Sequence, residues 1–300
     1  MVLMGPPSAG KTSMNGIIFA NVKAQETTKF QSTISLQRSS IRFMGNMNFS
    51  LWDCPTQKEF LYEYFTTQSE YIFSQVSVLV FVLDATSKTI HEDWKQFSQC
   101  VEFLSKYSYQ AKLFALIHKM DLVPERDKNK IFEAHSSKLQ SMSKHFNITC
   151  FQTSIWEETL YKAWSAIVNS LIPNAELIKQ RLTEFMNNIE AEEVILFEKS
   201  SFLHISHTTR NEDLFTDIHR IERISNIVKM FKISCLKGGT NNKSILVENS
   251  KFTALLQEFT QNSYILVITV DPEVNRTTTT INIQTAIPQF EKLLTQNPTE

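Results

Sequence analysis

The stretch Gly5-Pro6-Pro7-Ser8-Ala9-Gly10-Lys11-Thr12 matches the pattern G-x-x-x-x-G-K-[ST] at every fixed position. It follows a short apolar run, Met1–Met4, that predicts a strand, and it opens a run of helical pattern, Lys11–Val22. Glycines in such a turn let the backbone wrap around phosphate oxygens, and the first amide groups of a helix bind anions. The stretch therefore predicts a phosphate-binding loop at the first strand–helix turn of an α/β fold.

Short strand-like runs alternate with helical patterns outward from this loop. The expected strands are Met1–Met4, Ser40–Phe43, Phe49–Trp52, Val76–Leu83, Leu113–His118 and Thr149–Thr153. The expected helices are Lys11–Val22, Glu92–Ser105, Arg126–His145 and Leu160–Ser170. The later strands are near-continuous apolar runs, as in strands that a parallel sheet buries on both faces. The alternation predicts a doubly wound, mostly parallel six-stranded sheet.

A second domain is expected because 300 residues exceed the roughly 200–250 that one hydrophobic core normally serves. Pro173 follows the last helix of the alternating part, so we predict domains 1–173 and 174–300. The second part predicts helix Ala175–Ile189, strands Val194–Glu198 and Phe202–His207, an amphipathic helix through Leu214–Phe231, strand Ser244–Val247, helix Lys251–Thr260, strands Ser263–Val270 and Thr279–Gln284, and helix Ala286–Thr295. This order predicts a small α+β domain.

Composition and charge exclude several classes of function. The net charge of −1 gives no long-range attraction to nucleic acid, so we expect no nucleic-acid partner. The longest apolar runs, Val76–Leu83 and Tyr264–Val270, are far shorter than the roughly 20 residues of a membrane-spanning helix. Val2 excludes myristoylation and the end of the sequence has no prenylatable cysteine, so we expect no direct membrane insertion. The four cysteines form no C-x-x-C pair, which favours a reduced, cytoplasmic chain.

The loop and the strand ends that follow it predict triphosphate chemistry with Mg²⁺. Lys11 would reach the β- and γ-phosphates, and the Thr12 hydroxyl would ligate the metal ion. Asp53 ends a predicted strand, which suits a carboxylate that faces Mg²⁺. Gln57 lies four residues later, where a residue that orients the attacking water would lie.

Two later strand ends favour guanine over adenine. Asp121, in His118-Lys119-Met120-Asp121, offers a carboxylate that can accept hydrogen bonds from guanine N1–H and the N2 amino group. Adenine has no such pair of donors. The run Thr153-Ser154-Ile155 follows the next strand, where a backbone N–H can donate to guanine O6.

These residues resemble the Rag GTPase family, in particular its RagA/RagB (Gtr-one-like) branch. The resemblance is carried by the stretches Gly10–Met14, Ile17–Asn21, Phe49–Cys54 and His118–Val123, and most specifically by Thr153–Trp164. Histidine at position 118, where GTPases usually have asparagine, is a mark of this family. The similarity continues into Glu190–Val194, Ile205–His207 and Ile224–Ile227, so it covers nearly the whole chain.

The resemblance implies a P-loop GTPase fold followed by a roadblock/longin-like domain that pairs with a RagC/RagD-type subunit. It also implies docking on a lysosomal scaffold complex and nucleotide-dependent control of the TOR kinase complex in response to amino acids. The chain would then be cytoplasmic and recruited to the lysosome or vacuole surface by its partners. Thr33 matches the family's first switch, and its hydroxyl would complete the Mg²⁺ coordination when the γ-phosphate is present.

The expected site is therefore a set of three overlapping groups. GTP or GDP would be bound by Ser8, Ala9, Gly10, Lys11, Thr12, Ser13, Thr33, His118, Lys119, Asp121, Ser154 and Ile155. The metal would be held by Thr12, Thr33 and Asp53, and catalysis would rest on Gln57 and Lys11. Trp94, Trp156 and Trp164 are expected in the core or at an interface.

The second switch departs from the family pattern, which reads Asp-Cys-Gly-Gly-Gln. Here Pro55 and Thr56 replace the two glycines, which removes backbone freedom at the hinge of the switch. We therefore expect weak intrinsic hydrolysis of GTP. Two alternatives stay open: a nucleotide-dependent scaffold with little or no hydrolysis, and a membrane-traffic small GTPase.

Overall fold

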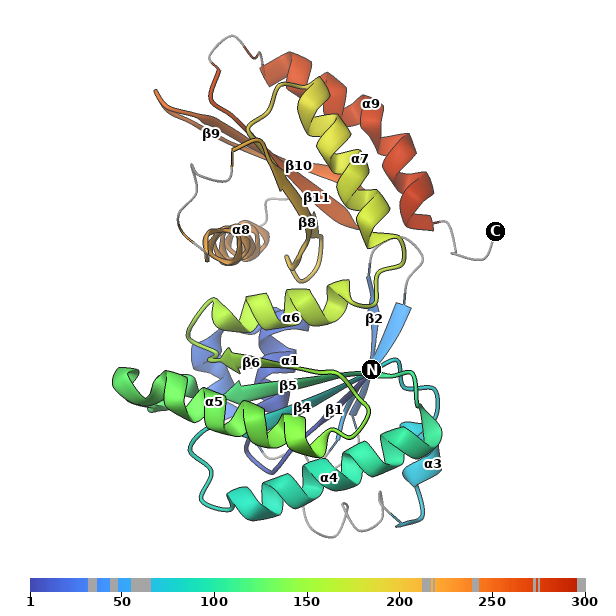
Figure 1. Cartoon of the computed structure of the whole chain (residues 1–300). Helices are drawn as coiled ribbons and strands as arrows, with labels where there is room; N and C mark the ends of the chain where they lie inside the picture. The colour runs from blue at the N-terminus through green and yellow to red at the C-terminus, as the bar shows by residue number, and fades with distance from the viewer. Residues whose placement is uncertain are drawn as a thin grey trace. The chain divides into compact units, whose positions relative to one another are not determined.

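The computed structural model describes most of the chain (Figure 1). The described residues are 1–31, 37–43, 48–54, 66–211, 217, 219–238, 243–271, 274 and 276–295. Their contacts divide the chain into two compact units, one of residues 1–41 and 49–163 and the other of residues 42–48 and 164–300. This division falls within α6 (Thr159–Asn169). The predicted boundary at Pro173 follows that helix, and it stays a prediction.

The first unit is built on a six-stranded sheet in the order β2-β3-β1-β4-β5-β6. The strands are β1 (Val2–Met4), β2 (Gln37–Arg42), β3 (Asn48–Asp53), β4 (Val78–Asp84), β5 (Lys112–His118) and β6 (Ile148–Thr153). β1 pairs in parallel with β3 and β4, and the pairs β4–β5 and β5–β6 are parallel too. The α/β class and the mostly parallel six-stranded sheet are thus confirmed.

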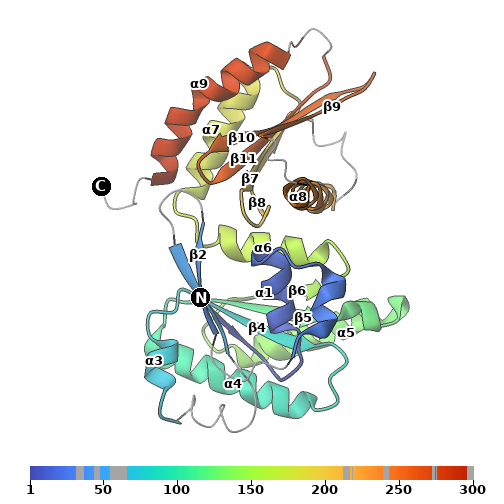
Figure 2. The same ribbon diagram turned by 180° about the vertical axis from the view of Figure 1, so that it is seen from behind.

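Helices cover both faces of this sheet. They are α1 (Lys11–Phe19), α3 (Ser69–Phe73), α4 (Ile90–Tyr107), α5 (Glu125–Met142) and α6, with the 3-10 segments η1 (Ala24–Lys29) and η2 (Met120–Leu122). α1 lies on one face, and α4 and α5 lie on the other (Figures 1 and 2). β4 is buried from Val78 to Leu83, which explains why its sequence is a continuous apolar run. Phe81 packs edge-on against Phe97 of α4 within this core.

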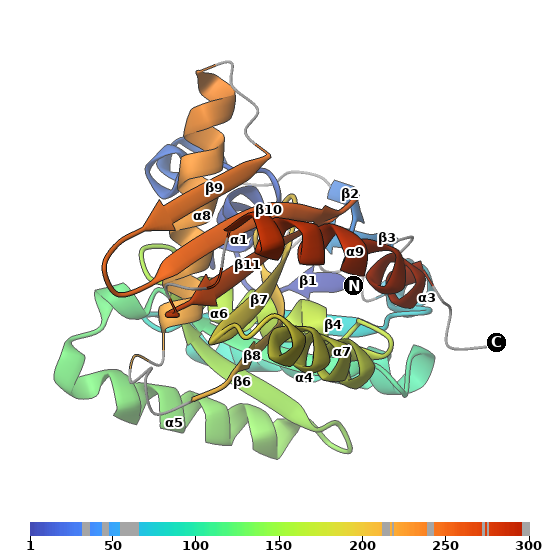
Figure 3. The ribbon, with the colours of Figure 1, turned by 90° about the horizontal axis from the view of Figure 1, so that it is seen from above.

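The second unit is an antiparallel sheet with helices on both faces. Its elements are α7 (Ala175–Asn188), β7 (Glu193–Glu198), β8 (His204–Thr209), α8 (Arg220–Lys237), β9 (Ser244–Glu248), β10 (Thr253–Thr260), β11 (Ser263–Thr269) and α9 (Arg276–Thr295). The strand order is β8-β7-β11-β10-β9. α8 lies on one face, and α7 and α9 lie on the other (Figure 3). The two strands predicted at Val194–Glu198 and Phe202–His207 are therefore present as β7 and β8, which pair antiparallel inside a five-stranded sheet.

Two predicted elements of this unit are wrong. The segment predicted as a helix, Lys251–Thr260, contains strand β10, which pairs with both β9 and β11. Its residues include good helix formers, but pairing on both sides overrides that local preference. The segment predicted as a strand, Thr279–Gln284, lies inside helix α9. Its threonines favour a strand locally, yet Thr279, Ile283 and Phe290 are buried at helical spacing.

Among the described residues, no helix is both long enough and apolar enough to cross a lipid bilayer.

Candidate functional site

The loop between β1 and α1 requires glycine at both ends. Gly5 has φ +141°, and a Cβ there would lie 2.1 Å from the carbonyl oxygen of Val82. Gly10 has φ +97°, and a Cβ there would lie 2.7 Å from Cδ2 of His118. Both backbone conformations are ones that residues with a side chain rarely adopt. The loop can therefore take this path only with glycine at these two positions.

The loop brings a helix start and a lysine together. α1 begins at Lys11, directly after Gly10, and no side chain caps this helix end. An uncapped helix start presents backbone N–H groups that bind anions well. Nζ of Lys11 donates to the carbonyl oxygens of Gly5 and Pro6 at 2.9 and 2.8 Å. Burial lowers the pKa of Lys11 to about 8, so the amine remains mostly protonated at neutral pH.

Thr12 and Asp53 form a pair that fits a divalent cation. Oγ1 of Thr12 donates to Oδ2 of Asp53 at 2.7 Å, although the two residues belong to different elements. Asp53 is fully buried at the end of β3, and its Oδ1 has no hydrogen-bond partner among the described residues. Burial raises the pKa of Asp53, while the Thr12 hydrogen bond and the charge of Lys11 oppose that shift. A buried carboxylate oxygen beside a hydroxyl is a donor set that Mg²⁺ prefers.

The ends of β5 and β6 form the opposite side of the site. His118 and Thr153 are register partners at the carboxyl ends of these parallel strands, where ligands bind in open α/β sheets. Oγ of Ser154 donates to Oδ1 of Asp121 at 2.6 Å. The same Ser154 oxygen accepts the backbone N–H of Trp156 at 3.1 Å. The Asp121 carboxylate is therefore oriented by the residue that follows β6.

His118 and Lys119 connect this side to the loop. Nδ1 of His118 lies 3.0 Å from Oγ1 of Thr153, and the imidazole packs against Gly10. Burial, with help from the charge of Lys119, lowers the pKa of His118 to about 4, so the ring is neutral. Nζ of Lys119 forms an ion pair with Oδ2 of Asp84 at 2.7 Å. This pair fixes the end of the Lys119 side chain.

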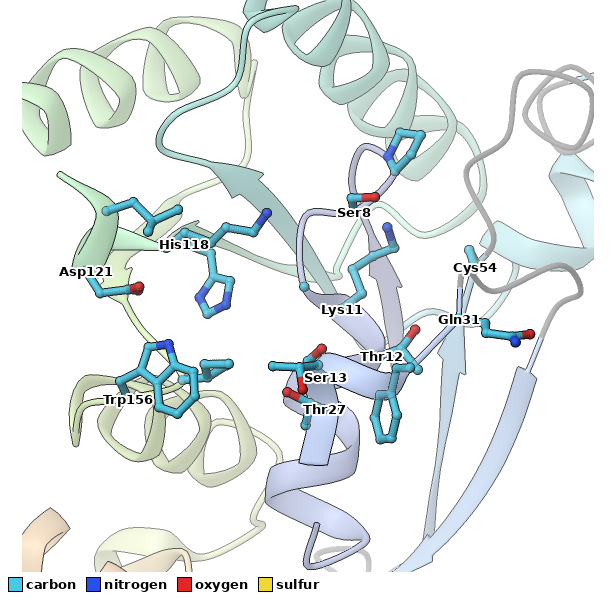
Figure 4. A pocket seen from close by; sticks show the side chains of 17 residues that line it. Ser8, Lys11, Thr12, Ser13, Thr27, Gln31, Cys54, His118, Asp121 and Trp156 are labelled. Carbon is cyan, nitrogen blue, oxygen red and sulfur yellow. The ribbon is translucent and has the colours of Figure 1, made fainter. Parts of the chain in front are cut away.

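These groups border one cavity of about 550 Å³ (Figure 4). Such a volume is within the usual range for small-molecule sites, about 300–1,000 Å³. The predicted residues that line it are Ser8, Gly10, Lys11, Thr12, Ser13, His118, Lys119, Asp121 and Ile155. Ala9 and Ser154 are fully buried and do not line it, and Asp53 reaches it through Thr12. Thr33 and Gln57 lie outside the described residues.

Several residues that line the cavity were not predicted from the sequence. The additional lining residues are Pro7, Thr27, Thr28, Phe30, Gln31, Cys54, Leu122 and Trp156. Thr27 belongs to the 3-10 segment η1, for which no pattern in the sequence was recognised. Trp156 lies inside the run Thr153–Trp164 that was singled out, so its nearness to Ser154 was an available signal.

Comparisons with known proteins show the family to which the chain is similar. The Gtr1/RagA G protein conserved region matches residues 1–228. Ras-related GTP-binding protein A of Dictyostelium discoideum is 46% identical over 98% of this chain and 97% of its own length. GTP-binding protein gtr1 of Schizosaccharomyces pombe is 43% identical over 95% of this chain and 93% of its own. A more distant relative, human Ras-related GTP-binding protein C, is 25% identical over 71% of this chain and 54% of its own.

The loop, the Thr12–Asp53 pair and the oriented Asp121 thus occur in a chain whose similarity to these proteins extends over nearly its full length. The chain belongs to the Gtr1/RagA family of GTP-binding proteins.

Proposed function

We propose that this chain is a Rag-type switch whose cavity binds GTP or GDP together with Mg²⁺. The observation that supports this most is the convergence of three different groups on one cavity. Lys11 supplies a buried positive charge, the Thr12–Asp53 pair supplies oxygen ligands, and Asp121 supplies an oriented carboxylate. Each group matches a different part of a guanine nucleotide, so together they favour this ligand over a simple phosphate.

The residues of the phosphate side would act on charge and position. Lys11 would neutralise the β- and γ-phosphates, and the N–H groups at the start of α1 would hold their oxygens. Thr12, Asp53 and Thr33 would hold Mg²⁺, which supplies further charge neutralisation on the phosphates when it is bound. Gln57 would orient the water that attacks the γ-phosphorus, which releases GDP and phosphate. The roles of Thr33 and Gln57 come from the sequence alone.

The carboxylate of Asp121 would select guanine, and Asp121→Asn tests this. The carboxylate can only accept hydrogen bonds, which suits guanine N1–H and its N2 amino group. Asparagine offers an N–H₂ group instead, which suits the C2 carbonyl of xanthine. We expect the variant to lose affinity for GDP by at least about 100-fold and to gain affinity for xanthosine diphosphate, since each polar group that the bound base covers and leaves unpaired costs about 1–3 kcal/mol.

Competition binding with fluorescent GDP measures both effects, and Asp127→Asn is a matched control because this α5 side chain is 43% exposed and does not line the cavity. The control should bind GDP as the unchanged chain does. If Asp121→Asn still prefers GDP over xanthosine diphosphate, Asp121 does not read the base and the proposed function loses its basis.

We further propose that hydrolysis is slow because Pro55 and Thr56 stiffen the second switch. The double change Pro55→Gly with Thr56→Gly should raise single-turnover phosphate release, and Gln57→Leu should abolish the gain. Equal release from the unchanged chain and the double variant would mean that these residues do not limit hydrolysis. No release from any of them would favour the second candidate function, a nucleotide-dependent scaffold.

The second unit would bind a Rag C/D-type subunit. Ras-related GTP-binding protein C is a relative of this chain, so two chains of one family could pair through like domains. An exposed apolar strip on α8 supports this, because Ile227 is 68% exposed and Phe231 is 44% exposed. β9 is the end strand of its sheet and carries Val247, 51% exposed, so it could accept a strand from a partner.

Recruitment to a lysosomal scaffold complex and control of the TOR kinase complex are proposed on family membership. The same holds for recruitment of the chain to the lysosome or vacuole surface. The alternative role in membrane traffic has no feature in its favour among the described residues.

A further inference from the structure

A half-exposed tryptophan gives the cavity an aromatic wall that no assigned role uses. Trp156 lines the cavity, and 50% of its surface is exposed. The indole extends into the cavity next to Asp121 (Figure 4). Leu122, which is 60% exposed, lines the same end of the cavity. Exposed aromatic surface is unfavourable in water, so an indole that borders a cavity indicates a surface for a ligand.

The position of Trp156 is tied to that of Asp121 by one hydroxyl. Oγ of Ser154 donates its proton to Oδ1 of Asp121 at 2.6 Å and accepts the N–H of Trp156 at 3.1 Å. The N–H of Glu157 also donates to the carbonyl oxygen of Ser154, at 3.4 Å. The turn that carries the indole is therefore held by the same contacts that orient the carboxylate. A planar ligand that meets Asp121 with its edge can then meet Trp156 with its face.

We propose that the indole of Trp156 stacks on the guanine base and sets how long a nucleotide stays bound. This inference rests on the proposed function, because it concerns the same cavity. Aromatic side chains stack on any base, so stacking contributes affinity and gives little selectivity. Trp156 therefore contributes affinity by stacking on the base, and Asp121 distinguishes guanine from other bases. Because the base is common to GDP and GTP, the effect of Trp156 is equal for both.

The test compares Trp156→Ala and Trp156→Phe with a matched control. Tyr109→Ala removes an aromatic side chain that is 66% exposed and does not line the cavity. Stopped-flow measurement gives the dissociation rates of fluorescent GDP and of a fluorescent, non-hydrolysable GTP analogue. We expect Trp156→Ala to raise both rates by about 5- to 150-fold, the range for loss of one stacked base. Trp156→Phe keeps a smaller aromatic face, so its dissociation rates should lie between those of the unchanged chain and those of Trp156→Ala. The dissociation rates of Tyr109→Ala should stay within about twofold of those of the unchanged chain.

A spectroscopic measurement separates stacking from a loss of local structure. Indole emission falls when the ring stacks on a guanine. The chain has four tryptophans, and Trp156→Phe leaves the other three in place. Addition of GDP with Mg²⁺ should lower the emission of the unchanged chain, and most of this change should be absent in Trp156→Phe. The preference for guanosine over adenosine nucleotides should be the same in both.

Three outcomes would overturn the inference. Dissociation rates that do not change in Trp156→Ala mean that the indole does not touch the base. Unchanged rates together with weaker binding of a partner subunit mean that Trp156 is a docking residue. An equal emission change in the unchanged chain and in Trp156→Phe means that another tryptophan reports the nucleotide.

The failure of this inference can be distinguished from a failure of the proposed function. If the unchanged chain binds guanosine nucleotides and Asp121→Asn prefers xanthosine nucleotides, only the stacking proposal has failed. If the unchanged chain binds no guanosine nucleotide, the proposed function fails too.

Discussion

At the scale of single residues, the cavity depends on positions that accept only glycine. Gly10→Ala would place a Cβ 2.7 Å from His118 in a backbone conformation with φ +97°. We expect the variant to lose about 1–3 kcal/mol of unfolding free energy, because either the loop or the imidazole must move. It should also bind GDP at least about tenfold more weakly, since the loop would no longer follow the same path. Urea unfolding and fluorescent GDP titration measure these effects.

Gly238→Ala is the control for this prediction. A Cβ at Gly238 would have its nearest contacts at 3.5 and 3.6 Å, which is ordinary van der Waals distance. That variant should keep both stability and GDP binding. A Gly10→Ala chain as stable as the Gly238→Ala chain would show that the close contact between the loop and His118 carries no strain.

Much of the site could be predicted from residues with fixed spacing. Lys11 and Thr12 follow from the loop pattern, and Asp121 follows from its place after a buried strand; all three line the cavity. The sequence places Trp156 near Ser154, but it does not show that the indole lines the cavity, because that depends on how Ser154 holds the turn after β6. The orphaned oxygen of Asp53 likewise became visible only when β3 placed it beside Thr12.

At the scale of elements, central strands of the first unit were predictable because burial on both faces leaves a long apolar run. β4 and β5 are of this kind. The second unit was harder, since local preference and tertiary pairing disagree there. β10 contains Ala254, Leu255 and Leu256, which favour a helix locally, and it is a strand only because β9 and β11 pair with it.

The outer face of α8 gives a prediction at the same scale. Ile227→Glu combined with Phe231→Glu puts charge on the exposed apolar strip, so pairing with a Rag C/D-type subunit should weaken at least about tenfold. The monomer should fold as before, because neither side chain is buried. Co-expression followed by size-exclusion chromatography and titration calorimetry measures the pairing.

The control is Ile281→Glu on α9, where the isoleucine is 55% exposed on a different helix of the same unit. It should leave pairing unchanged. If the double variant of α8 pairs as tightly as this control, the partner does not bind the strip and the proposed interface is elsewhere.

At the scale of the whole molecule, the sequence predicted the fold classes of both units. The boundary predicted at Pro173, where a helical pattern ends, stays a prediction, and the contacts divide the chain within α6. A division inside a helix cannot be predicted from sequence pattern, because the helical periodicity of α6 continues through it.

The central claim is that the whole chain binds guanine nucleotides in the cavity between Lys11 and Asp121. Equilibrium titration of the nucleotide-free chain with fluorescent GDP and fluorescent ADP, each with Mg²⁺, tests it most directly. The account predicts tight binding of GDP and binding of ADP weaker by about 10⁴-fold, because adenine leaves the Asp121 carboxylate without donors. Equal affinity for the two nucleotides, or tighter binding of ADP, would contradict it.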